Sequence, residues 1–208
     1  DPIVYDNRAV RGWEADNTGL GDDFTITTLA AGGTAWSNGS GDAIPAAIQG
    51  QIVPGTDFFV VSGGQRANVT LNGNPGNPAN SLTTSGSSNI PQGTVITVVE
   101  SDCSDADMFQ KSNNAAAGGL TKGAGGSPGN TTPAGGFSGT YDDEADVFVF
   151  TSTAYFIGQG ANGGPALFRE RLDPGNTAGA VELAEGVENM QILYGLDTDP
   201  TPGANSYV

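Results

Sequence analysis

The sequence predicts a mainly β protein, built on an antiparallel sheet with long loops rich in glycine and asparagine. Three observations support this fold class. Short segments of β-branched and aromatic residues recur between turn signals. The 208 residues include 33 glycines and 12 prolines, which favour turns and long connections. Apolar residues make up 37% of the chain, which is enough for a packed core and argues against a disordered chain.

Five segments carry the strand signals. The strongest is 147–157, where nearly every residue is a β former and neither glycine nor proline occurs. Residues 166–172 alternate in strand fashion after a turn-like sequence, so we expect a hairpin between these two segments. Shorter strands are expected at 24–29, 56–61 and 94–99.

Residues 181–194 fit two kinds of structure. Val187, Met190 and Tyr194 lie at helical spacing, but Gly186 interrupts the pattern. We favour a strand, a short turn and a second strand. Low-complexity loops are expected at 30–43, 72–92 and 112–140. Loops of this length are usually functional or mobile.

The charge of the chain excludes some partners. It has 23 acidic and 7 basic residues, a net charge of −16, and its only lysines are Lys111 and Lys122. Nucleic acids and anionic membranes are bound by clusters of basic residues, so we predict no nucleic-acid partner and no binding to an anionic surface. No apolar run approaches the roughly 20 residues that span a bilayer. From its abrupt ends at Asp1 and Val208 we expect a fragment of a longer protein.

The sequence gives little support to catalysis, and we predict that the chain is not an enzyme. It contains no histidine, the commonest general base. Carboxylates occur together at Asp142, Asp143, Glu144 and Asp146, but a charge run before a strand is typical of a solvated turn. We therefore predict no catalytic residues.

Cys103 is the only cysteine of the chain. One cysteine cannot form a disulfide within the domain. Two interpretations stay open. The thiol is either a small buried apolar group or half of a disulfide whose partner lies outside this chain.

Calcium is the one cofactor that the sequence suggests. Oxygen-bearing residues alternate in a short segment near the end of the chain, as in loops that surround a hard cation. The candidate ligand positions are Asp197, Asp199, Thr201, Gly203 and Asn205. The pattern departs from a calcium loop at Thr201 and Pro202, and no glutamate closes it. The alternative is a polar turn between strands.

Aromatic side chains offer a further possibility, a surface adhesin. Trp13, Trp36 and Tyr141 could stack on sugar rings, although so few aromatic residues more often serve core packing.

Four stretches, in this order, resemble the PilW family of minor pilins. The most specific is the last, which runs through Glu-Gly-Val-Glu-Asn-Met-Gln and Tyr-Gly-Leu-Asp-Thr-Asp. The stretches are Ala9-Val-Arg-Gly-Trp-Glu14, Pro54-Gly-Thr-Asp-Phe-Phe-Val-Val61, residues 101–110, and residues 167–171 followed by 182–199.

The resemblance implies an α+β pilin-like fold in which a long N-terminal helix packs on an antiparallel sheet. Residues 1–208 would form a single globular pilin head domain without that helix and without the last strands. Family members often carry a cysteine just after the helix, which would be the partner of Cys103. In the family the Asp-Thr-Asp stretch continues as a calcium-like loop, from which this chain departs at Pro200, Thr201 and Pro202.

The resemblance also implies a structural role without catalysis. The protein would join other minor pilins and pilin subunits in a complex that primes type IV pilus assembly, at the filament tip. Its place would be the cell-surface pilus of a Gram-negative bacterium, assembled from the inner membrane and periplasm, with membrane contact only through the absent helix. The alternatives are a J-type pseudopilin of type II secretion, and a surface adhesin or calcium-dependent binding module.

Overall fold

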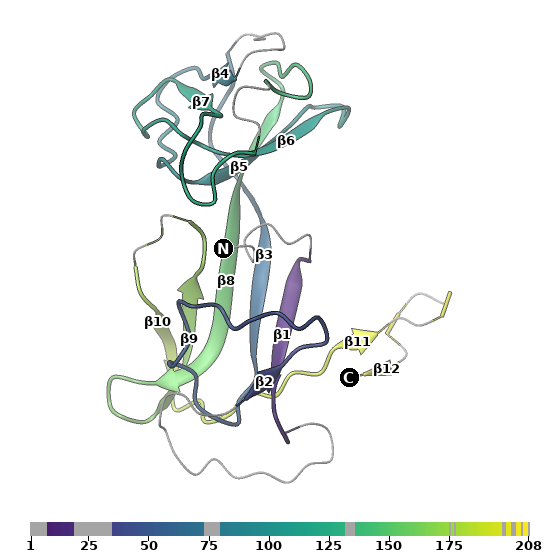
Figure 1. Ribbon diagram of the computed structural model, residues 1–208, viewed down its shortest axis with the longest axis vertical. Coiled ribbons are helices and arrows are strands. Elements are labelled where there is room, and N and C mark those ends of the chain that lie inside the picture. Colours follow the sequence, from purple (N-terminus) through teal and green to yellow (C-terminus); the bar gives the residue numbers. More distant parts are fainter. Residues whose placement is uncertain are drawn as a thin grey trace. The chain divides into compact units, whose positions relative to one another are not determined.

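The computed structural model describes residues 8–18, 35–72, 80–131, 136–174, 176, 178–196, 199–200, 203–204 and 206–207. Within these residues the protein is mainly β, with antiparallel strand pairing and no helix, which confirms the predicted fold class (Figure 1). It follows that no described helix could span a membrane.

Contacts divide the chain into two compact units. Unit 1 comprises Asp1–Ala9, Ser62–Ser152 and Leu172–Thr177, and unit 2 comprises Val10–Val61, Thr153–Arg171 and Ala178–Val208. Two long strands, β3 (Phe58–Arg66) and β8 (Asp146–Gln159), contribute residues to both units. The single pilin head domain over 1–208 stays a prediction.

Unit 2 contains a sheet in the order β10-β9-β8-β3-β1-β2. Its strands besides β3 and β8 are β1 (Val10–Ala15), β2 (Trp36–Ser37), β9 (Pro165–Arg171) and β10 (Val181–Glu185), and a separate pair is formed by β11 (Gly195–Leu196) and β12 (Ser206–Tyr207). The expected hairpin is confirmed by β8 and β9, which pair from Thr153 with Arg171 to Gln159 with Pro165.

The core of unit 2 lies on one face of this sheet. Trp13 and Phe58 are paired across β1 and β3, and their rings stack with centroids 4.7 Å apart. Ile52 bridges to Gly158 at the end of β8 and is fully buried. Residues directly opposite each other on paired strands lie on the same side of the sheet, so Trp13 and Phe58 share one face.

Unit 1 has its own core. Strand β5 (Val95–Val99) pairs with β6 (Ala106–Gln110) and with β8, while β4 (Ser81–Thr83) pairs with β7 (Gly119–Thr121). Apolar side chains from both sheets and from the connecting loops form one buried cluster, which includes Leu82, Ile96, Val98, Phe109, Leu120, Phe137 and Tyr141.

Most of the expected strands are present, and some were not foreseen. Strands β3, β5 and β9 overlap most of the segments expected at 56–61, 94–99 and 166–172, and β8 covers the whole of 147–157. The segment 24–29 lies outside the described residues. Strand β10 matches the first half of 181–194. The second strand expected there is wrong, because 187–194 has no regular structure. Strands β2, β4 and β7 lie inside the expected loops.

Candidate functional site

The side chain of Asp57 joins two distant segments of unit 2. It follows a turn at Gly55, whose φ of 81° favours glycine, and it is 3% exposed. Its Oδ1 accepts the N–H of Ala15 at 2.9 Å, and its Oδ2 accepts the N–H of Ile192 at 2.8 Å. Its own N–H donates to the carbonyl of Met190 at 2.9 Å. Asp57 therefore fastens the irregular segment 187–194 to the start of β3 and to the end of β1.

Tyr194 makes a second contact between the same segments. A Cβ atom at Gly12 would lie 1.4 Å from the Tyr194 Oη, so only glycine fits under this ring. The Tyr194 Oη is buried and has no hydrogen-bond partner among the described residues. Nearby, the Gln191 Nε2 donates to the carbonyl of Gly55 at 3.1 Å. The segment 187–194 is thus held by side chains and main chain together.

Burial controls the protonation chemistry here. Desolvation raises the pKa of the Asp57 carboxyl, although the N–H groups of Ala15 and Ile192 act in the opposite direction. Desolvation likewise raises the pKa of Tyr194, and the nearby Asp57 charge adds to the increase. Asp57 accepts hydrogen bonds from main-chain N–H groups, so the arrangement stabilises the fold.

Three of the four stretches singled out for their resemblance to the PilW family meet at this point. Gly12 lies in the first, Asp57 in the second, and Ile192 and Tyr194 in the last. The part around Ile192 also lies in a segment that matches a protein family. Residues 154–208 match the family model of PilW, type IV pilus-assembly protein W.

The match covers about a quarter of the chain and includes β9, β10 and the segment 187–194. The resemblance to the PilW family is confirmed for these residues. The stretches at 9–14 and 54–61 lie outside the match but contact the matched part through Gly12, Gly55 and Asp57. No curated protein and no solved structure matches the chain.

The PilW match associates the chain with type IV pilus assembly. It implies a location in the bacterial cell envelope or at the cell surface, and pilus-related protein partners.

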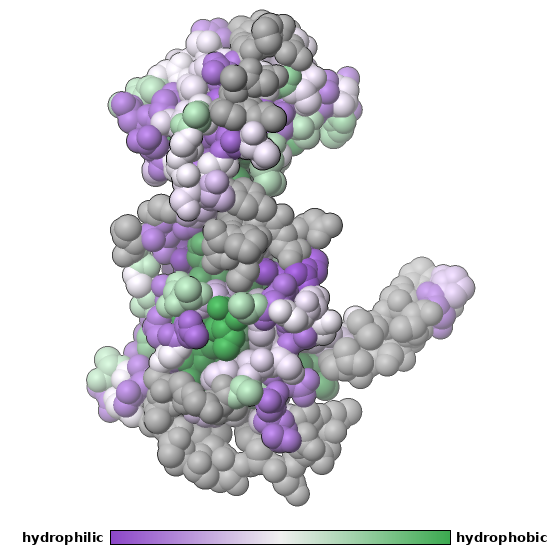
Figure 2. Space-filling model, in the orientation of Figure 1, coloured by the Kyte–Doolittle hydropathy of each residue, from purple (hydrophilic) through white to green (hydrophobic). Residues whose placement is uncertain are grey.

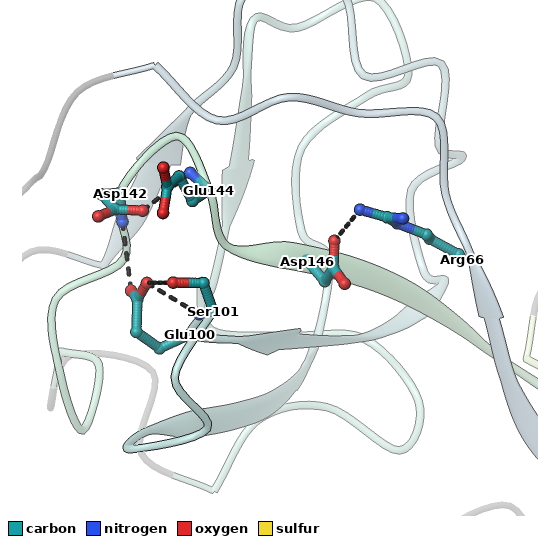
Figure 3. A network of polar contacts seen from close by, with 6 residues as sticks. All are labelled: Arg66, Glu100, Ser101, Asp142, Glu144 and Asp146. Atoms are coloured by element: carbon teal, nitrogen blue, oxygen red, sulfur yellow. Dashed lines mark hydrogen bonds and ion pairs between the residues drawn. The ribbon is translucent and has the colours of Figure 1, made fainter.

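Acidic residues gather in unit 1, around a hollow of about 300 Å³ lined by residues that include Glu100, Asp102, Asp105 and Asp142. Figure 3 shows the hydrogen bonds of two of these carboxylates, Glu100 and Asp142. Glu100 accepts the N–H of Ser101 at 2.9 Å and that of Asp142 at 3.3 Å, and Asp142 accepts the N–H of Glu144 at 2.8 Å. The bonds to Ser101 and Glu144 are local and stabilise turns, whereas the bond between Glu100 and Asp142 joins two distant loops. The described residues contain no group of three or more potential ligands placed to hold a metal ion.

The charge run continues into β8 at Asp146. Asp146 forms an ion pair with Arg66 of β3 (Figure 3). Both side chains are solvent-exposed, and exposed ion pairs contribute little to stability.

Cys103 is an exposed free thiol with a φ of 61°. The interpretation as a buried apolar group is therefore wrong, while the disulfide with a cysteine outside the chain stays a prediction.

The calcium prediction falls mainly on residues outside the described ones. Asp197, Thr201 and Asn205 belong to this undescribed part, and only Asp199 and Gly203 are described, both of them exposed. The calcium site stays a prediction.

The aromatic residues considered for sugar stacking serve packing instead. Trp13 and Tyr141 are fully buried. Trp36 is half-buried, packs edge-on against Phe58, and donates through its Nε1 to the carbonyl of Thr56 at 2.8 Å. The core interpretation accounts for all three.

An apolar strip lies on the other face of the unit 2 sheet, formed by Val10, Phe59, Val61 and Tyr155. Val10 and Val61 face each other across β1 and β3 and are 51% and 39% exposed. The rings of Phe59 and Tyr155 stack beside them with centroids 5.1 Å apart. The sequence contains a signal for this strip, because Phe58-Phe59-Val60-Val61 is apolar at every position and therefore predicts a strand with two apolar faces.

Apolar residues are also visible elsewhere on unit 2. On the face seen in Figure 2 they gather in the region of β8 and β9, with polar residues around them. At the sheet edge, Val181 and Leu183 of β10 are both about half exposed.

Proposed function

We propose that this chain is the head of a minor pilin, a structural subunit that helps to prime type IV pilus assembly together with other minor pilins, at the filament tip. The PilW match supports the pilus system. The polar groups around Asp57 support a structural role over catalysis, because they bond to the main chain of the family-matched segment 187–194.

The observation that carries the proposal is the apolar strip of unit 2. Its four side chains lie on two neighbouring strands and on β8, and two of them leave a large share of their surface open to solvent. Burying such surface is favourable by about 25 cal/mol per Å². In the pilin architecture the N-terminal helix packs on the sheet. We assign the strip as the surface that receives this helix.

Gene deletion in the native host tests the assembly role. We expect surface filaments, counted by electron microscopy, to disappear on deletion and to return when the full-length protein is supplied. Normal filament numbers with failed attachment to surfaces would instead support an adhesin. Normal filaments with failed protein export would support a pseudopilin of type II secretion.

A strip variant tests the helix-docking surface. Val61→Glu in the full-length protein places a charge in the middle of the strip, so we expect few or no filaments. Met108→Glu is the matched control, because Met108 is 50% exposed and belongs to unit 1. The control should assemble normally. Equal filament numbers for both variants would contradict the assignment of the strip, provided that circular dichroism shows both to be folded.

A further inference from the structure

Lys111 is buried inside unit 1 although it carries an amine. Its side chain is 0% exposed. The Nζ donates to the main-chain carbonyls of Asn113 and Asn114, each at 2.7 Å. Burial lowers the pKa of Lys111, as expected for an ammonium group removed from water.

Lys122 is placed in the same way. It is 8% exposed, and its Nζ donates to the carbonyl of Gly136 at 2.6 Å. The Nζ also lies 5.7 Å from the centroid of the Phe137 ring, within the range of a cation–π contact. Both lysines of the chain therefore bond to main-chain oxygens of the glycine-rich segment 112–140.

Neither amine has a carboxylate partner among the described residues, although the chain has 23 acidic residues. Burying an amine without a hydrogen-bond partner is unfavourable. The hydrogen bonds to three carbonyl oxygens therefore explain how the protein accommodates both buried amines. The same hydrogen bonds provide a donor for each of those carbonyls. They belong to loop residues outside the named strands. Gly136 is buried, and a buried carbonyl must find a donor somewhere.

Other side chains complete the same loops. The Gln110 Nε2 donates to the carbonyls of Gly93 and Ser127 at 2.7 and 2.9 Å. The Asn130 Nδ2 donates to the carbonyls of Gln110 and Gly123 at 2.9 and 2.8 Å. Side chains thus supply donors that strand pairing supplies elsewhere, and Lys111 is the most buried of them.

We propose that Lys111 and Lys122 are internal clamps that close the glycine-rich loops of unit 1, and that their amines are withheld from solvent. A small alkylammonium ion should then replace a deleted clamp. This inference does not depend on the proposed pilin role.

Chemical rescue tests the clamp in the purified 208-residue chain. Lys111→Ala removes the atoms from Cγ to Nζ, which n-propylammonium replaces. We expect amide hydrogen exchange over 112–121 to rise at least about tenfold in the variant. It should return toward the wild-type rate in about 100 mM n-propylammonium, since a ligand of the folded state protects it. Tetramethylammonium at the same concentration has no N–H donor and should not rescue.

Arg171→Ala is the control, because it removes an exposed cation from β9 and should neither raise this exchange nor respond to the amine. Wild-type exchange rates in Lys111→Ala would overturn the proposal. Equal rescue by both ammonium salts would do so too, because it would show an effect of salt and not of N–H donors.

Amine labelling keeps the proposal testable if Lys111→Ala does not fold. Under native conditions acetic anhydride should modify the N-terminal amine of the wild-type chain and leave Lys111 and Lys122 unmodified. After denaturation all three amines should react. Native labelling of either lysine, at a rate similar to that of the N-terminus, would refute the inference.

Discussion

The buried side chains described above, which bond to irregular segments, differ in kind between the two units. Unit 2 buries a carboxyl group, Asp57, which accepts main-chain N–H groups from Ala15 and Ile192. Unit 1 buries amines, Lys111 and Lys122, which donate to main-chain carbonyls. In both units the buried polar group bonds to the main chain of an irregular segment. The comparison shows that single buried side chains help to hold the irregular segments of both units, where strand pairing does not.

The largest expected effect concerns Asp57. Asp57→Ala leaves the N–H groups of Ala15 and Ile192 without their acceptor, and a buried unpaired group costs about 1–3 kcal/mol each. We expect a loss of about 3 kcal/mol in the free energy of unfolding, measured by chemical denaturation, with faster hydrogen exchange at Ile192.

Asp146→Ala is the matched control for Asp57, because it removes a carboxylate from the exposed ion pair with Arg66. Such pairs contribute about 0–1 kcal/mol. Equal losses for the two variants would show that Asp57 does not fasten the segment 187–194.

Gly12→Ala should have the next largest effect. The new methyl group would overlap the Tyr194 Oη, so the ring must move away from β1. Overpacking of this kind costs about 1–3 kcal/mol. The cost should fall in a Tyr194→Ala background, as a double-mutant cycle would measure. Gly63→Ala is the control, since nothing lies within 4 Å of its added Cβ. Additive costs for the Gly12 and Tyr194 changes would argue against the contact.

Strands with strong local patterns could be predicted, and strands that depend on distant partners could not. The hairpin of β8 and β9 follows from long runs of β formers around one turn. Strand β1 was missed because Arg11, Gly12 and Glu14 weaken its local signal, and it is a strand because it pairs with β3. Strands β4 and β7 pair with each other across the loops in the same way.

For the candidate site, too, local sequence features could be predicted and contacts between distant segments could not. The resemblance identified the stretches that contain Gly12, Asp57 and Tyr194, but no local pattern places them together. In 187–194 the structure forms neither the helix that the spacing of Val187, Met190 and Tyr194 allows nor the second strand that we favour. Gly186 turns the chain with a φ of 75°, and the following main chain bonds to Asp57, 135 residues away from Ile192, and forms no helix.

The pH dependence of the two units should differ in sign. Burial lowers the pKa of Lys111 below the ordinary 10.5, so the unfolded chain holds this proton more tightly. The Lys111 contribution to stability therefore rises as the pH increases from its folded pKa to 10.5. Burial raises the pKa of Asp57 above 3.8, so its contribution falls as the pH increases from 3.8 to its folded pKa.

The difference between wild type and Lys111→Met isolates the alkaline part of this prediction. As the pH approaches 10.5, we expect the difference in the free energy of unfolding between wild type and the variant to change in favour of wild type. The comparison cancels Tyr141 and Tyr194, whose pKa values are also raised and whose contributions fall in alkali. Parallel curves for the two proteins would show that Lys111 titrates as it does in water.

The smallest effect is expected from calcium. A loop that surrounds calcium needs several oxygen ligands on a sharply turning main chain. Pro200 and Pro202 flank Thr201 in place of the glycine-rich turn of such loops, and the two described candidates, Asp199 and Gly203, are exposed. We therefore expect the melting temperature of the chain to be the same in millimolar calcium and in chelator. An increase with calcium would establish a ligand of the folded state, and its loss in Asp199→Asn would place that ligand at the end of the family-matched segment. Unlike the lysine clamps, the C-terminal segment would then depend on a cation from solution for its order.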